Sequence, residues 1–327
     1  MTPDLRAATR NVAGRSYRKV GELGRRLLGD DEPDVVDPAP PSHVAADPPP
    51  SAPHLAAEPA PVAPYPDPAC PPWLPLPGST GAICNICRWV GEAFVGRQHV
   101  ELYQCPACGS NGRDRFLHWC FTNRVGLSPA LRIIECSPRL REPYRSAMST
   151  WFFYRTSDYD LRAHKGNLQL DLQAIELPDG CLDVMLCAHV LEHVPDTDKA
   201  LAELRRVIAP GGHLLLQVPV LQGHTAPPTE PEFHGDNTPV FWRFGFDLTA
   251  RLRAQGFTTE LLCTAELANA VAAGQNPWSR WAPEFDVPDM LSAVIADDLV
   301  VVADGATSAR LGIEPGYMYL TWDCVAG

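Results

Sequence analysis

The amino-acid sequence predicts an α/β protein with a doubly wound, largely parallel sheet. Residues 182–220 show a buried strand, a polar loop, an amphipathic helix and a second buried strand, which together make a βαβ unit. Apolar runs at 131–136 and 151–156 supply further strands before this unit. The chain has 327 residues, 45% of them hydrophobic and 20% charged, which is enough for one large domain and a small module. Since open parallel sheets bind ligands beyond the carboxyl ends of their strands, we expect the functional site there.

Residues 1–80 are not expected to join this sheet. Residues 1–30 are basic and carry a weak apolar stripe. Such a helix could rest on an anionic membrane or partner surface, but we favour the simpler interpretation of a solvated, partly frayed helix. Residues 31–80 hold 17 of the 34 prolines. This composition cannot build a core and predicts a disordered or semi-extended linker.

Two C-x-x-C pairs define the next segment. Cys84 and Cys87 form the first pair, and Cys105 and Cys108 form the second, further along the chain. Two knuckles at this separation place four thiolates around one zinc ion, so residues 81–122 are predicted to form a zinc ribbon. Four cysteine ligands leave no open coordination position, and a structural Zn²⁺ is therefore expected. Four free thiols are the alternative, but so small a lobe would then have too little core to fold.

Composition also bears on location and partners. The chain has 11 cysteines, no apolar segment of signal-peptide type and no apolar run long enough to cross a bilayer, so we expect a cytoplasmic protein with reduced thiols. The net charge of −12 argues against a general nucleic-acid surface. Arg113 and Arg115 follow the ribbon in a predicted docking helix. Interdomain ion pairs are their favoured role, and holding an anionic substrate group is the alternative. The oligomeric state is unknown at this stage.

Residues 123–327 are predicted to form the α/β domain. Asp196 is expected to cap the helix of the βαβ unit, and Pro210-Gly211-Gly212 to end it. Asp247 caps a later helix that stops at Gly256. Two further strands are expected near the C-terminus, one of them antiparallel at the sheet edge. The predicted strands cover 131–136, 151–156, 168–172, 182–186, 214–218, 258–263, 299–303 and 317–322, and the other predicted helices cover 139–148 and 246–255.

The sequence around the βαβ unit resembles a known family. LDVMLCAHVLEHVPD followed by ALAELRRVIAPGGHLLLQVP is similar to the fourth strand, fourth helix and fifth strand of class I S-adenosylmethionine-dependent methyltransferases of the type 11 kind. The similarity extends to DLQAIELPDG before this segment and FGFDLTARLRAQGF after it, and covers about residues 82–262. It implies a Rossmann-like, seven-stranded sheet that binds S-adenosylmethionine (SAM) behind an N-terminal zinc ribbon.

The resemblance also implies a set of cofactor contacts. Asp158, after the second strand, would accept hydrogen bonds from the ribose hydroxyls. Asp171, with Leu172, would lie against the adenine. Three residues just past the fourth strand would line the methionine end of the cofactor: Cys187, Ala188 and His189.

The loop after the first strand departs from the family pattern. Glu135 would take the acidic position that helps to hold the amino-acid moiety, with Ser137 beside it. The family sequence at this point is D/E-x-G-x-G, whereas Glu135-Cys136-Ser137-Pro138-Arg139 contains no glycine. Without glycine, close approach of the backbone to the cofactor is less easy.

Methyl transfer to oxygen usually requires a general base, and histidine titrates near neutral pH. His193, His189 and His234, in that order, are the candidates. Each also has a simpler interpretation, as a cap of the strand end, a loop hydrogen-bonding residue or an exposed loop residue. The segment 224–242 follows the fifth strand and is expected to form the acceptor loop for a small molecule, such as a sugar or a secondary metabolite.

Two alternatives to this function stay open. A zinc ribbon can present RNA to a following catalytic domain, which would make the chain an RNA methyltransferase. The acidic net charge weighs against this alternative. A non-catalytic, methyltransferase-like scaffold is the second alternative. The missing glycines favour the scaffold, and the polar loop at residues 189–193 disfavours it.

Overall fold

The computed structural model describes most of the chain after the proline-rich segment. It covers residues 80–96, 103–140, 142–164, 166–220, 222–234, 237–275, 287–313 and 320–327, together with Leu76 and Gly78. The predicted basic segment and nearly all of the predicted linker lie outside these residues. Among the helices of the described part, none is both long and apolar enough to cross a membrane.

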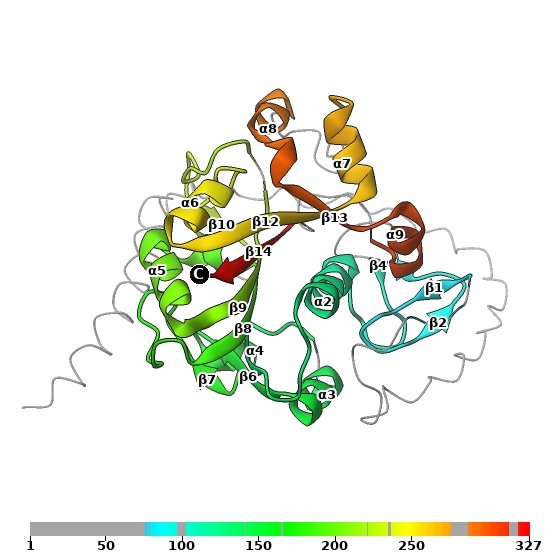
Figure 1. The fold of residues 1–327 in the computed structure, drawn as a ribbon, viewed down its shortest axis with the longest axis horizontal. Coiled ribbons are helices and arrows are strands. Elements are labelled where there is room, and N and C mark those ends of the chain that lie inside the picture. The colour runs from blue at the N-terminus through cyan, green and yellow to red at the C-terminus, as the bar shows by residue number, and fades with distance from the viewer. Residues whose placement is uncertain are drawn as a thin grey trace, which may run out of the picture. The chain divides into compact units, whose positions relative to one another are not determined.

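An eight-stranded sheet forms the centre of the α/β domain (Figure 1). Its strands lie in the order β13-β12-β14-β9-β8-β5-β6-β7. Every neighbouring pair is parallel except the two pairs made by β14, which runs antiparallel to both β9 and β12. The strands are β5 Arg132–Cys136, β6 Phe153–Asp158, β7 Leu168–Gln169, β8 Leu182–Ala188, β9 Ile208–Gln217, β12 Phe257–Thr264, β13 Leu299–Ala303 and β14 Thr321–Ala326.

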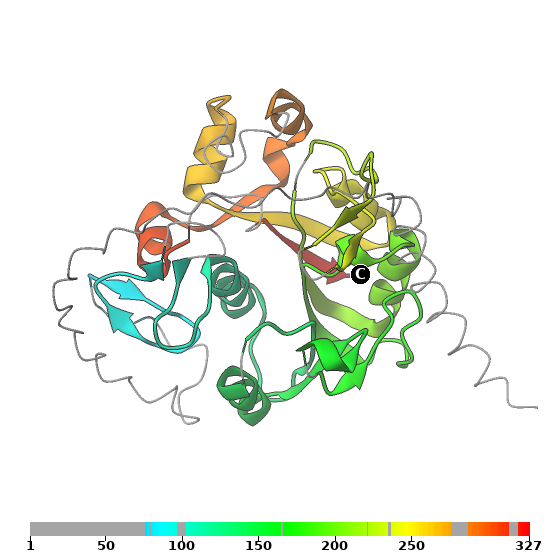
Figure 2. The same cartoon turned by 180° about the vertical axis from the view of Figure 1, so that it is seen from behind.

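Helices cover both faces of this sheet. Helices α5 and α6 lie on one side, and α2 and α3 lie on the other, as Figure 2 shows from behind. The helices are α2 Gly112–Arg124, α3 Glu142–Trp151, α4 Leu161–His164, α5 Thr197–Val207, α6 Leu248–Ala254, α7 Ala265–Ala272, α8 Val287–Ala293 and α9 Gly305–Leu311, with short 3₁₀ turns η1 Leu191–His193 and η2 Ala296–Asp298.

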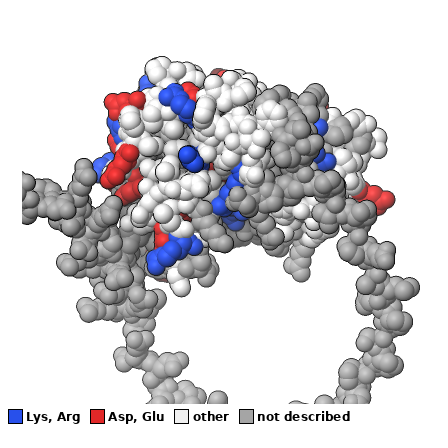
Figure 3. Space-filling view, turned by 90° about the horizontal axis from the view of Figure 1, so that it is seen from below, with Lys and Arg blue, Asp and Glu red and all other residues white. Residues whose placement is uncertain are grey.

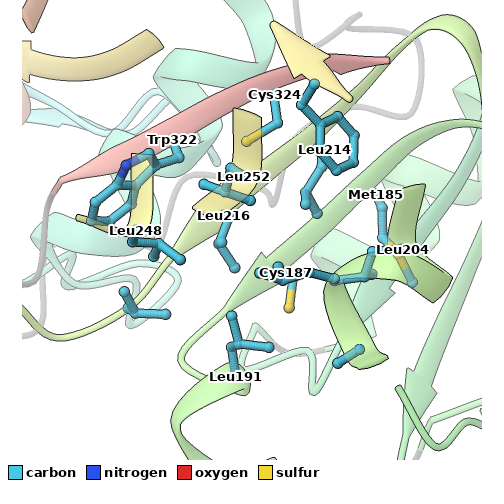
Figure 4. Close-up of a cluster of buried hydrophobic side chains, with 14 of the residues drawn as sticks. Met185, Cys187, Leu191, Leu204, Leu214, Leu216, Leu248, Leu252, Trp322 and Cys324 are labelled. Atoms are coloured by element: carbon cyan, nitrogen blue, oxygen red, sulfur yellow. The ribbon is translucent and has the colours of Figure 1, made fainter. Parts of the chain in front are cut away.

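Strand β8 shows why both faces need covering. Its successive side chains point to opposite sides of the sheet. Met185 and Cys187 pack into the core under α5 and α6, and Val184 and Leu186 pack into the core shared with α2 and α3. Figure 4 shows the first of these cores, where side chains of β8, β9 and β14 meet those of both covering helices. The nearly continuous apolar sequence of this strand is the pattern expected of a strand buried on both faces.

The structure confirms the predicted α/β class and the mostly parallel sheet, but corrects the strand count. The resemblance implied seven strands, and the sheet has eight, because β13 pairs in parallel with β12 and extends the edge. The predicted antiparallel edge strand was also wrong. The antiparallel strand is β14, and it lies inside the sheet between β9 and β12. An interior place suits its almost complete burial.

Two helix ends also differ from the prediction. Asp196 caps α5 as expected, since its Oδ1 accepts a hydrogen bond from Lys199 N at 3.0 Å. The helix, however, ends at Val207, and Pro210-Gly211-Gly212 lies within β9 in an irregularity of its pairing with β8. Asp247 makes no capping hydrogen bond to α6, because its Oδ1 accepts from Thr225 N and Oγ1 instead.

The remaining differences are shifts of a few residues in where a helix or strand begins or ends. The helix predicted at 139–148 is α3, which begins later, at Glu142, and the strand predicted at 151–156 is β6, which begins at Phe153. The strand predicted at 168–172 keeps only two paired residues, because the chain turns at Asp171, whose Oδ1 accepts from Gln173 N.

The four-cysteine module, residues 82–110, consists of two small hairpins. Strand β1 (Ala82–Ile83) pairs with β2 (Val90–Gly91), and β3 (Val95–Gly96) pairs with β4 (Tyr103–Gln104). The module has no separate core, because its cysteines share a hydrophobic cluster with α2, α3 and one face of the sheet.

Arg115 of α2 joins this module to the distant helix α9. Its side chain is fully buried and its guanidinium lies 3.8 Å from the centre of the Phe94 ring. It donates hydrogen bonds to backbone carbonyls on both sides, Tyr103 and Ser110 in the module and Leu311 and Gly312 after α9. Arg115 therefore links two parts of the chain as predicted, but mainly through carbonyl oxygens where carboxylates were expected.

We expect Arg115→Met to destabilise the protein by about 3–5 kcal/mol, because buried carbonyls at the module and at α9 lose their donor. The matched control is Arg132→Met, which breaks a half-exposed ion pair with Asp183 and is expected to change stability by less than about 1 kcal/mol. Chemical denaturation of both variants measures the difference. Equal effects would contradict the linking role of Arg115.

Candidate active site

The order of the strands creates a crevice at one edge of the sheet. Strand β5 pairs with β6 on one side and with β8 on the other. The connection after β5 therefore leads to β6 on one side, and the connection after β8 leads to β9 on the opposite side. Ligands of doubly wound sheets bind outside the carboxyl ends of the strands at such a point. A narrow pocket lies there, and its walls come from α2, β5, α3 and β8. Its lining residues are Asp114, Leu117 and His118 of α2, Glu135, Cys136, Ser137, Arg139, Leu140 and Tyr144 at the end of β5 and the start of α3, and Leu186 and Ala188 of β8.

The loop after β5 makes its turn without glycine. Ser137 has a positive φ of 45°, the left-handed conformation that glycine usually supplies, and its N–H donates to Ser157 O at 2.7 Å. Arg145 holds the next residues by donating to the carbonyls of Pro138 and Leu140 at 2.9 and 3.0 Å. A non-glycine residue in this conformation costs about 1–2 kcal/mol, and such strain clusters at ligand sites. The turn after β5 therefore forms although this loop contains no glycine.

Two acidic side chains line the pocket, the buried Glu135 and the partly buried Asp114. Tyr154 Oη donates to Glu135 Oε2 at 2.5 Å. Burial raises the pKa of Glu135 to about 7, against the lowering effect of the Tyr154 hydrogen bond, and the nearby Asp114 charge raises it further. Burial also raises the pKa of Asp114. Because burial raises both pKa values, the two carboxyls suit a cationic ligand, which would stabilise their ionised forms.

The predicted ribose and adenine contacts lie along the same sheet edge, outside the described pocket lining. Asp158 ends β6 with its side chain buried, and its Oδ1 accepts from Asp160 N at 3.1 Å. Asp171 follows β7 and accepts hydrogen bonds from Gln173 within its own turn. Leu172 packs in the core under α5. The edge is continuous because β5, β6 and β7 are neighbours in the sheet.

The three residues predicted at the methionine end point in different directions. Ala188 lines the pocket. Cys187 is fully buried in the core on the opposite face of the sheet, so the structure does not bring its thiol to the pocket. His189 follows β8 with a positive φ of 56°, and its N–H donates to Gln217 O at 2.8 Å. Strained residues thus end both β5 and β8 at the crevice.

Two of the three candidate bases lie beside Glu192, and the third contacts one of them. His189 Nδ1 lies 3.7 Å and His193 Nε2 lies 3.8 Å from Glu192 Oε1. The rings of His193 and His234 meet edge to face, with centroids 4.7 Å apart. His193 Nδ1 donates to Pro239 O at 2.7 Å, which assigns the proton to this nitrogen because a carbonyl can only accept. In the neutral ring, Nε2 is then left as the acceptor.

Glu192 is the buried centre of this cluster. Its side chain is 2% exposed, and neither carboxyl oxygen has a hydrogen-bond partner among the described residues. Burial raises the pKa of Glu192 to about 8, so the carboxyl is mostly protonated at neutral pH. Its backbone carbonyl accepts from Phe241 N and Trp242 N, which fastens the segment that contains these two residues to η1.

Sequence reasoning missed the residues that α2 and α3 bring to the pocket. Asp114, His118 and Tyr144 come from helices whose positions depend on the module and the sheet. The capping box of α2, in which Asn111 and Asp114 exchange hydrogen bonds, is a readable signal for the helix start. It does not reveal which face of the helix meets the sheet.

Glu192 should make stability depend on pH. Between its ordinary pKa of 4.5 and about 8, the folded state keeps a proton that the unfolded state releases, so stability falls as pH rises. Between pH 6.5 and pH 8, we expect the free energy of unfolding to fall by about 1–2 kcal/mol less in Glu192→Gln than in the unmodified protein. Denaturant unfolding at both pH values measures it, with exposed Glu176→Gln as the control. An unchanged pH dependence in Glu192→Gln would contradict the assignment.

Comparison with known proteins identifies a domain in the middle of the chain. A family model described as a methyltransferase domain matches residues 155–216, which run from β6 nearly to the end of β9. The chain is 45% identical over 49 residues to an uncharacterized 37.1 kDa protein in transposon TN4556 of Streptomyces fradiae, which is 15% of this chain and 14% of that protein. It is 43% identical over 53 residues to the probable methyltransferase ltbC of Aspergillus luteorubrus, which is 15% of this chain and 18% of that protein.

These curated relatives are matched over less than a fifth of their own length. Among solved structures, the chain is similar to an S-adenosylmethionine-dependent methyltransferase from Mesorhizobium loti, with 15% identity and a TM-score of 0.32 over 42% of this chain and 78% of that one. Likeness at this score carries no information about function. The family match shows that residues 155–216 are similar to a methyltransferase domain.

Proposed function

We propose that this protein is a SAM-dependent methyltransferase that transfers a methyl group to an oxygen or nitrogen atom of a small-molecule acceptor. The observation that carries the proposal is the position of the matched domain. Residues 155–216 include most of β6, all of β8 and most of β9, and the carboxyl end of β8 forms one wall of the pocket at the point where the strand order reverses.

The residues at the crevice fit this cofactor. SAM supplies a methyl group on a positively charged sulfur when it is bound, and its amino-acid end carries an ammonium group. The Glu135 and Asp114 carboxyls offer negative charge in a buried setting, where it interacts strongly. Asp158, one strand further along the edge, has the two oxygens that a pair of ribose hydroxyls requires.

His193 is the best supported base among the three candidates. Its ring is held by the hydrogen bond to Pro239 and by the contact with His234, so its Nε2 has a fixed direction. A proton released by an acceptor hydroxyl would go to this Nε2. Glu192 lies next to it, with its Oε1 3.8 Å from this Nε2, and burial raises the pKa of the Glu192 carboxyl to about 8.

The acceptor loop supports a small, partly apolar acceptor. The hairpin of β10 (Glu232–Phe233) and β11 (Pro239–Val240) adjoins η1, and Phe233 is 38% exposed. Trp242 is oriented by its Nε1–H, which donates to Pro195 O at 3.0 Å. Arg243 Nε pairs with Glu232 Oε2 at 2.8 Å, so its charge is already matched within this segment. We propose a sugar or a secondary metabolite as the acceptor.

The RNA alternative finds less support. In the described part of the face shown in Figure 3, basic side chains form small separate groups among uncharged and acidic ones. A protein that binds the phosphate backbone of RNA needs a continuous basic surface. The net charge of −12 points the same way.

We also propose that the four-cysteine module holds one structural Zn²⁺. The four Sγ atoms lie within 4.8 Å of one another, and Cys84 Sγ–Cys108 Sγ and Cys87 Sγ–Cys105 Sγ are both 3.6 Å apart. Thiolates around a tetrahedral zinc at about 2.3 Å are separated by about 3.8 Å, so the present arrangement fits the ion. Each knuckle is followed by a left-handed residue, Arg88 or Gly109, that closes its turn.

Calorimetric titration with S-adenosylhomocysteine tests the proposed activity. We expect the purified protein to bind it, and Asp158→Asn to weaken binding about tenfold or more, because an amide replaces one of the acceptor oxygens for the ribose. Asp183→Asn, at the amino end of β8, is the matched control and should bind like the unmodified protein. If no binding is seen at millimolar ligand, the enzyme proposal fails and the scaffold remains.

Metal analysis tests the zinc proposal. We expect about one equivalent of zinc per chain, and its loss in a Cys84→Ser plus Cys87→Ser variant, together with a lower melting temperature. Cys181→Ser changes a cysteine outside the cluster and should keep the metal. A double variant that loses the metal yet keeps its stability would refute the structural role.

A further inference from the structure

Helix α2 presents a buried histidine to the pocket. His118 is 5% exposed and lines the pocket beside Glu135 and Ala188. Neither of its ring nitrogens has a hydrogen-bond partner among the described residues. The ring is nevertheless held in place, because it packs edge to face on Tyr144 at 6.0 Å and at a tilt on Phe121 at 6.1 Å.

An arrangement of this kind needs a partner. A buried polar group without a hydrogen bond costs about 1–3 kcal/mol, and native proteins contain few of them. Burial lowers the pKa of His118 to about 4, so the ring is neutral and offers one N–H donor and one acceptor nitrogen. A ligand that occupies the pocket would provide hydrogen-bond partners for the ring nitrogens of His118.

The neighbours of His118 indicate what that ligand carries. Asp114 lies one turn earlier on the same helix and lines the same pocket, and Glu135 faces it from β5. The two carboxyls can accept hydrogen bonds from an ammonium group, and the His118 N–H can donate to a carboxylate. An α-amino acid carries both groups on one carbon, so the three side chains together match it. Asp158, the expected ribose contact, lies outside this lining.

We propose that His118 binds the α-carboxylate at the methionine end of SAM, with Asp114 on the adjoining ammonium group. This inference rests on the proposed methyltransferase function. It makes α2, the helix that begins directly after the second knuckle, a wall of the cofactor site. The four-cysteine module then acts in cofactor binding by fixing this helix, and needs no nucleic acid to explain its presence.

Two variants and two ligands test the assignment. His118→Leu removes both polar nitrogens, and His118→Gln keeps a donor. We expect His118→Leu to bind S-adenosylhomocysteine at least tenfold more weakly than the unmodified protein, and His118→Gln to stay within about threefold. Binding of 5′-methylthioadenosine, which lacks the amino-acid end, should be the same in all three proteins. Zinc content and melting temperature report whether the variants fold.

The outcomes separate this inference from the function on which it rests. If the unmodified protein binds no S-adenosylhomocysteine, the proposed function itself fails. If His118→Leu binds it normally, or loses affinity for both ligands equally, only the role of His118 is overturned. Should His118→Leu not fold, ring-nitrogen NMR of the unmodified protein decides. The ring signals of His118, assigned by their absence from the spectrum of His118→Gln, must shift with S-adenosylhomocysteine and not with 5′-methylthioadenosine.

Discussion

The parallel pairing of β5 with both β6 and β8 is the constraint on which the rest of the structure depends. It places the carboxyl ends of β5 and β8 side by side. The connections that follow these two strands lead to opposite sides of the sheet, so neither fills the space beyond the strand ends. The backbone at both ends is strained, at Ser137 and at His189. Every residue that we assign to the cofactor or the acceptor lies at this edge or is brought to it by a helix or loop packed against it.

Much of the fold could be predicted from sequence, because the central strands are apolar on both faces and the linking helix has one apolar stripe. Residues 182–220 formed the predicted strand, helix and strand. The predictions failed where pairing between segments that are distant in the sequence determines the structure. Pro210-Gly211-Gly212 indicates a helix end locally, but the chain is already extended from Ile208 and uses these residues in β9. The place of β14 between β9 and β12 has no local signal at all.

The candidate site was predictable to a similar degree. The polar loop after β8 pointed to His189 and His193. The structure places both beside Glu192, and the His193 ring contacts that of His234. The family pattern led to Glu135, which lines the pocket, and to Cys187, whose thiol lies on the other face. The wall formed by Asp114 and His118 was not foreseen, since the packing of α2 depends on the module before it and on α9, close to the far end of the chain. Buried carboxyls at Glu135 and Glu192 owe their raised pKa values to this tertiary burial, which sequence does not show.

The carbonyl contacts of Arg115 have a consequence for how the protein is made. Arg115 and Leu311 are 196 positions apart, so their hydrogen bond can form only when nearly the whole chain has been synthesised. The four cysteines of the module span a short stretch of chain, from Cys84 to Cys108, but their hydrophobic cluster is shared with α2, α3 and one face of the sheet. Helix α2, which carries Asp114 and His118, gains its final support last. The wall of the pocket therefore depends on contacts between segments that lie far apart in the sequence, which makes its folding slow compared with that of the local elements.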